Sequence, residues 1–109
     1  MFFKKKKSLT EINREDRKLI ESNAKSFETL LILSRDESFK KELTRVQGKV
    51  KFLTPSTIEK VFNFDKKIKE AIGDLKISLT KDGDTESNLK AIKLLQDIEI
   101  LITERESAN

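Results

Sequence analysis

The chain has 109 residues, of which 39% are charged and 36% are hydrophobic, and it carries a formal net charge of +4. With three glycines, one proline and neither tryptophan nor tyrosine, this composition favours a helical domain over a β-sheet or a disordered chain. The absence of cysteine and histidine excludes disulfides, thiolate nucleophiles, the commonest general base and the commonest transition-metal ligands. We therefore expect a non-catalytic protein without a cofactor or a small-molecule substrate.

The first predicted helix follows a capping signal near the N-terminus and continues to Ser34. Ser8 and Glu11 have the S-x-x-E spacing of a capping box, and Thr10 is an alternative cap. Apolar side chains then recur at helical intervals, at Ile12, Leu19, Ile20, Phe27, Leu30 and Leu31. We assign residues 1–9 to a flexible basic tail and residues 10–109 to a single helical domain.

A second helix is predicted to begin near Ser34, because Ser34 and Glu37 repeat the capping-box spacing. Its apolar seam advances in steps of four and three residues, through Phe39, Leu43, Val46, Val50 and Leu53. A new helix is expected at the segment FLTPSTIE, since Pro55 suits only the first turn of a helix and Thr54 can cap it.

The third and fourth predicted helices are separated by the turn sequence KDGDT. The apolar face of the third comprises Ile58, Val61, Phe64, Ile68, Ile72, Leu75 and Leu79. That of the fourth comprises Leu89, Ile92, Leu95, Ile98 and Ile102. Short connections between helices of about 18 to 25 residues favour an all-α fold, an antiparallel up-down four-helix bundle. The alternative is a three-helix bundle with a long bent first helix that continues through the segment LSRDESF.

Asp65 lies beside the apolar seam of the third predicted helix, between Val61 and Ile68. An unpaired carboxylate would be costly to bury there, so a partner is required. One interpretation places Asp65 at the edge of the seam, paired with Lys69 one turn further along. A second is an interhelical pair with an arginine or lysine that fixes the register of the helices, and a third, the least favoured, is a functional pocket.

The net positive charge of the chain is confined to its opening stretch, MFFKKKK. Residues 10–109 carry 19 basic and 19 acidic side chains, so the predicted domain is neutral overall. Its charges are unevenly placed, with six basic and three acidic residues in 34–53 but three basic and seven acidic residues in 82–109. In a bundle these two segments either face one another or present opposite poles to partners.

The opening stretch has three interpretations. The first is a mobile, solvated terminus that improves solubility. The second is contact with an anionic membrane surface, made by Phe2, Phe3, Lys4, Lys5, Lys6 and Lys7. The third, nucleic-acid binding, is the least favoured, because a neutral domain without an aromatic platform lacks the features of a dedicated binder.

The function class that this sequence favours is a small helical interaction module, which binds a protein partner or a second copy of itself. Some of Phe62, Ile77, Leu94 and Ile100 could form an exposed apolar patch for that purpose, unless a wide core absorbs them. A peripheral membrane protein and a weak nucleic-acid-associated protein are the alternatives. With no secretory signal and no run of about 18 apolar residues, we expect a cytoplasmic protein, or one at the inner face of the membrane if the basic stretch binds it.

Overall fold

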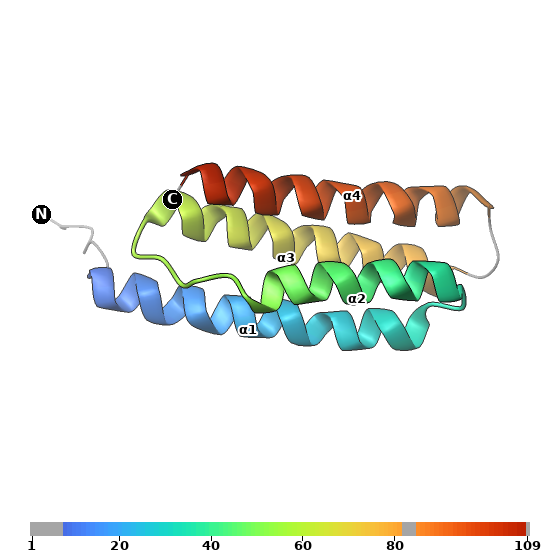
Figure 1. Cartoon of the computed structure of the whole chain (residues 1–109), viewed down its shortest axis with the longest axis horizontal. Helices are drawn as coiled ribbons and strands as arrows, with labels where there is room; N and C mark the ends of the chain where they lie inside the picture. Colours follow the sequence, from blue (N-terminus) through green and yellow to red (C-terminus); the bar gives the residue numbers. More distant parts are fainter. Residues whose placement is uncertain (1–7, 82–84, 109) are drawn as a thin grey trace, which may run out of the picture.

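The computed structural model describes residues 8–81 and 85–108, and within these ranges it contains helices and no strand. The helices are α1 (Leu9–Leu33), α2 (Glu37–Lys51), α3 (Glu59–Thr80) and α4 (Thr85–Ala108). They lie side by side and their directions alternate along the chain (Figure 1). The predicted all-α, up-down four-helix bundle is therefore confirmed. Because α1 and α2 are separate helices, the three-helix alternative is excluded.

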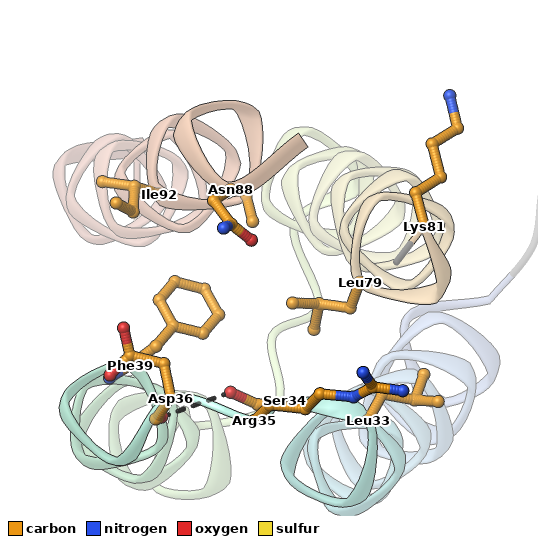
Figure 2. A pocket seen from close by; sticks show the side chains of 10 residues that line it. Leu33, Ser34, Arg35, Asp36, Phe39, Leu79, Lys81, Asn88 and Ile92 are labelled. Atoms are coloured by element: carbon orange, nitrogen blue, oxygen red, sulfur yellow. Dashed lines mark hydrogen bonds between the residues drawn. The ribbon is translucent and has the colours of Figure 1, made fainter. Parts of the chain in front are cut away.

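The order of the helices around the bundle differs from their order in the chain. Helix α1 packs against α2 and α3, and α4 packs against α3 and α2, so α2 and α3 are diagonal to each other (Figures 1 and 2). The connection through residues 52–58 crosses this diagonal. Parallel neighbours consequently meet in two seams, α1 with α3 and α2 with α4, and the α2–α4 seam is the least extensive of the four.

One apolar seam on each helix forms the core, and its side chains recur in alternating steps of four and three residues. The buried apolar members are Ile20, Ala24, Phe27 and Leu30 of α1; Leu43, Val46 and Val50 of α2; Val61, Ile68, Ile72 and Leu75 of α3, with Phe62 beside them; and Ala91, Leu95, Ile98 and Ile102 of α4. This spacing is typical of helices that pack lengthwise in a bundle. No helix among the described residues combines the length and the hydropathy that crossing a bilayer requires.

The caps of α1 and α2 were predicted with unequal success. Ser8 caps α1 as expected, since its Oγ accepts a hydrogen bond from the Glu11 N–H at 3.1 Å, and Leu9 already lies in the helix. The predicted cap of α2 was wrong: Asp36, not Ser34, caps it, through a 2.8 Å bond from the Ser38 N–H. Ser34 still belongs to the end of α1, where its N–H bonds to the carbonyl of the preceding turn. A cap must lie just outside its own helix, and Asp36 does.

The predicted start of α3 at Thr54 and Pro55 was also wrong. Helix α3 begins at Glu59, with Ile58 as a cap that makes no side-chain bond, and the preceding residues form a non-helical connection. Within this connection the Oγ of Ser56 accepts from the Ile58 N–H at 3.0 Å. The Ser56 N–H and the Thr54 carbonyl are bonded to buried side chains of other helices, and these contacts hold the segment out of a helix.

The apolar face predicted for α4 was wrong near the start of the helix. Leu89 and Ile92, predicted to be buried, are 64% and 46% exposed, and Ala91 takes the core position instead. Successive steps of three residues rotate a stripe by about 60° per step around an α-helix, so the predicted series drifts off the core face. The alternating steps of Ala91, Leu95, Ile98 and Ile102 keep to that face.

Candidate functional site

Three charged side chains form a buried layer at one end of the bundle. Asp16 of α1 and Asp65 of α3 are fully buried, and Arg105 of α4 is 2% exposed. All three continue the seams of their helices, since Asp16 precedes Ile20 by four residues and Arg105 follows Ile102 by three. We call these residues the charge layer. Helix α2 ends before this level, and residues 52–58 run past it instead (Figure 1).

The Arg105 guanidinium connects every chain segment around the charge layer. Its Nε donates to Asp65 Oδ1 at 2.8 Å, and its Nη2 donates to Asp16 Oδ2 at 3.3 Å and to the Thr54 carbonyl at 2.8 Å. Asp16 Oδ2 also accepts from the Ser56 N–H at 2.8 Å. The charge layer therefore joins α1, α3 and α4 to the crossing connection, and it fixes where that connection lies.

Sequence reasoning identified only one member of the charge layer. Asp65 pairs with Arg105, which is 40 residues further along the chain, and its carboxylate makes no bond to Lys69. Asp16 and Arg105 were not singled out, because the seams were traced through apolar residues alone. The alternating four- and three-residue steps, extended to polar positions, were the signal that could have found them.

The electrostatics of the charge layer are unusual because two carboxyl groups share one guanidinium. Burial and, to a lesser extent, the hydrogen-bonding proximity of the Asp16 carboxyl together raise the pKa of Asp65 to about 8, against the opposing effect of Arg105. Asp16 Oδ1 and Asp65 Oδ2 have no hydrogen-bond partner. With at most 2% of any of these residues exposed, the charge layer is not presented to a ligand from solution.

The accessible candidate site lies at the opposite end of the bundle, where α2 begins. A cavity of about 280 Å³ opens there between the ends of all four helices. Figure 2 shows Phe39 of α2 and Leu79 of α3 pointing into it, with Asn88 and Ile92 of α4 on the facing side. Lys81 points away from it (Figure 2).

A second cavity of about 320 Å³ continues from the first along the α2–α4 seam. The two cavities adjoin at Asp36, Phe39 and Ile92, which line both, and together they make up one surface feature. We call it the α2–α4 groove, and define its seam portion by Asp36, Ser38, Phe39, Glu42, Arg45, Ile92, Leu95, Gln96 and Glu99. Apolar side chains form its floor near the start of α2, and charged side chains close its far end.

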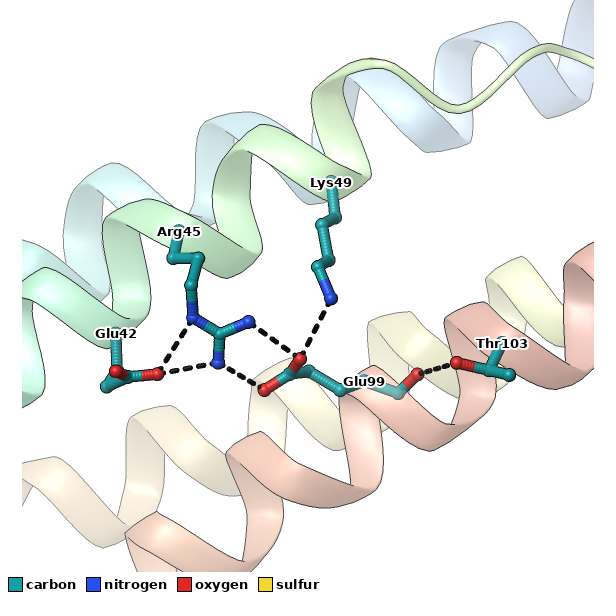
Figure 3. A network of polar contacts seen from close by, with 5 residues as sticks. All are labelled: Glu42, Arg45, Lys49, Glu99 and Thr103. Atoms are coloured by element: carbon teal, nitrogen blue, oxygen red, sulfur yellow. Dashed lines mark hydrogen bonds and ion pairs between the residues drawn. The ribbon is translucent and has the colours of Figure 1, made fainter.

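An ion-pair network closes the far end of the α2–α4 groove (Figure 3). Arg45 of α2 donates to Glu42 at 2.6 Å and to both carboxylate oxygens of Glu99 on α4, at 2.6 and 2.9 Å. Lys49 donates to Glu99 at 3.1 Å. Hydrogen bonds from Arg45, assisted by Lys49, lower the pKa of Glu99 to about 2. Through this network the basic segment 34–53 faces the described part of the acidic segment at Glu99.

An exposed apolar stripe on α4 borders the α2–α4 groove. Leu89, Ile92 and Ile100 are 64%, 46% and 53% exposed, and with Gln96 they recur at helical spacing along one flank. Ile100 is one of the four candidates that the sequence offers for such a patch, and it is exposed. Of the other candidates, Phe62 is buried and Leu94 half-buried in the core, whereas Ile77 is exposed on α3.

The residues predicted to contact an anionic membrane, namely Phe2, Phe3, Lys4, Lys5, Lys6 and Lys7, lie outside the described residues. Their role remains a prediction from the sequence. No family model, no curated protein and no solved structure matches this chain.

Proposed function

We propose that the protein is a non-catalytic interaction module that binds an amphipathic helix of a protein partner in the α2–α4 groove. The observation that carries this proposal is the pair of adjoining cavities along the seam between α2 and α4, both of which are lined by Phe39 and Ile92. Such a groove, with an apolar floor and a helical wall on each side, suits the helix-in-groove mode of recognition.

The dimensions of the α2–α4 groove favour a helix over a small molecule. On α4 its lining extends from Asn88 to Glu99, which is about 16 Å at the rise of an α-helix. That length matches about three turns of a helix that would lie along the seam. The exposed Leu89 and Ile100 on the adjoining flank would widen its apolar contact.

The charges around the α2–α4 groove favour an apolar ligand over nucleic acid. The network at its far end contains two carboxylates and two cations that already neutralise one another. Binding that depends on phosphate contacts needs a surplus of cations, which this surface lacks. The affinity would therefore come from burying Phe39, Ile92 and Leu89.

A photo-crosslinking amino acid at Ile92, introduced in the cells from which the protein comes, tests this proposal. We expect one main adduct, with the attachment point on the apolar face of an amphipathic helix in the partner. Adding Leu89→Lys should reduce that adduct about tenfold, because it places a charge on the apolar flank that the partner helix would cover. The matched control places the same amino acid at Ile32, an exposed apolar residue of α1 that does not line the groove.

Three results would contradict the proposal. An adduct of twice the chain mass would show that a second copy occupies the groove. Identical adducts from positions 92 and 32 would show that the groove has no selectivity. Insensitivity to Leu89→Lys would count against the proposal in the same way.

The basic opening stretch gives a second candidate function, because Phe2 and Phe3 precede four consecutive lysines. Membrane attachment predicts binding to anionic but not neutral vesicles, weakened by changing both phenylalanines to serine even at high salt. A nucleic-acid arm predicts DNA binding that falls steeply with salt and tolerates the serine changes. We expect neither surface to retain the protein at physiological salt, and a chain lacking residues 1–7 to melt at the same temperature. Vesicle sedimentation and DNA retention of the intact and truncated chains distinguish these outcomes.

A further inference from the structure

The charge layer carries an uncompensated negative charge if all three of its members are ionised. Two adjacent buried carboxylates would then face a single guanidinium, and one negative charge would remain without compensation. Each carboxyl group also has one fully buried oxygen without a donor, Asp16 Oδ1 and Asp65 Oδ2. Uncompensated charge and unbonded buried oxygens are both costly, and one added proton would remove both costs.

We propose that Asp16 Oδ1 and Asp65 Oδ2 share one proton in the folded protein, so that the charge layer is a buried proton-binding site. The proton forms an O–H···O hydrogen bond between the two unpartnered oxygens. The remaining oxygens keep their bonds, Asp65 Oδ1 from the Arg105 Nε–H and Asp16 Oδ2 from the Arg105 Nη2–H and the Ser56 N–H. One carboxylate, one carboxylic acid and one guanidinium give a neutral layer.

Few other groups act on this proton. Helices α1, α3 and α4 each contribute one charged side chain to the layer, namely Asp16, Asp65 and Arg105. Residues 52–58, which run past it, contain no charged side chain. Asn23 of α1 is uncharged and donates to the Asp65 carbonyl at 3.1 Å. Helix α2 ends at Lys51 and supplies none of the bonds of the charge layer. The titration of the site is therefore set by these two carboxyl groups and Arg105.

The direction of the pH dependence follows from linkage. The pKa of Asp65 rises from 3.8 to about 8, so between these values the folded chain holds a proton that the unfolded chain has lost. The folding equilibrium constant should fall about tenfold per pH unit across this window and become flat above it. The stability contributed by the site is thus fully present below about pH 3.8 and is lost as the pH rises to about 8, which is opposite to the behaviour of an ordinary paired aspartate.

Proton release on unfolding tests the inference directly. When the intact wild-type chain is unfolded with urea at about pH 6 in a pH-stat, we expect about one proton to be released per chain, falling toward zero well above pH 8. Asp65→Asn should release none, because its amide can donate to Asp16 Oδ1 in place of the proton while its oxygen accepts from Arg105. Its melting temperature should also lose most of the pH dependence seen in the wild type.

The matched control is Asp74→Asn, an exposed aspartate of the same helix, which should release the wild-type number of protons. No release from the wild type would overturn the proposal, since a water molecule or a cation bridging two ionised carboxylates gives that result. Undiminished release from Asp65→Asn would overturn it equally. If Asp65→Asn does not fold, the proton count of the wild type decides the question alone.

Discussion

Replacement of Arg105 by methionine should lower the free energy of unfolding by about 3–5 kcal/mol, as expected when one partner of a buried ion pair is removed. The change leaves Asp16 and Asp65 without their cation and frees the Thr54 carbonyl. Methionine retains much of the volume, so the loss is electrostatic and not a cavity effect. Urea unfolding of wild type and variant, followed by circular dichroism, measures it.

Two further variants separate this mechanism from a general intolerance of change. Arg17→Met, at an exposed position of α1, should alter the stability by no more than about 0.5 kcal/mol. Combining Arg105→Met with Asp16→Asn and Asp65→Asn should restore part of the loss, because no buried charge then remains unpaired. A single Arg105→Met variant as stable as Arg17→Met would show that the charge layer contributes nothing to stability.

Replacement of Phe27 by alanine should cost about 3–5 kcal/mol, the usual range for a large side chain removed from a packed core. Phe27 of α1 is fully buried against the seams of its neighbours. For a domain of this size, each kcal/mol corresponds to a fall of about 4–8 °C in melting temperature. Thermal unfolding should therefore show one of the largest shifts among single alanine variants.

Phe52→Ala is the matched control, because it makes the same chemical change at a side chain that is 83% exposed. We expect it to change the stability by no more than about 0.5 kcal/mol. Equal losses from the two variants would mean that Phe27 is not in the core or that Phe52 is covered in solution. Measuring both at several protein concentrations distinguishes these explanations, since only self-association makes the melting temperature depend on concentration.

Local features of the sequence were sufficient to predict the helices of this protein. The capping box of Ser8 and Glu11 located the start of α1, and the steps through Leu43, Val46 and Val50 located the core face of α2. Such signals involve residues within one or two turns of each other. Their effect on the backbone is therefore much the same whatever the rest of the chain does.

Contacts between distant segments decided the features that the sequence did not predict, namely the start of α3 and which helices are neighbours. Pro55 is a good first residue for a helix, yet α3 begins at Glu59 because Asp16 and Arg105 bond to the backbone of the connection. The same bonds accompany the diagonal crossing of residues 52–58, which makes α1 and α3 parallel neighbours. Neither the partner positions nor their geometry is visible in a local window of sequence.

For the candidate sites, too, local sequence signals predicted one part and long-range contacts decided the rest. Asp65 could be recognised from the sequence as a carboxylate in need of a partner, because its burial follows from the seam of α3 alone. The choice of Arg105, the proximity of Asp16 and the opening of the α2–α4 groove required the tertiary structure. The sequence by itself determined four amphipathic helices and the absence of cysteine and histidine chemistry. Only the packing of the helices decided which of them became neighbours and which polar groups met between them. Pairing across about 40 or more residues depends on how all four seams fit together.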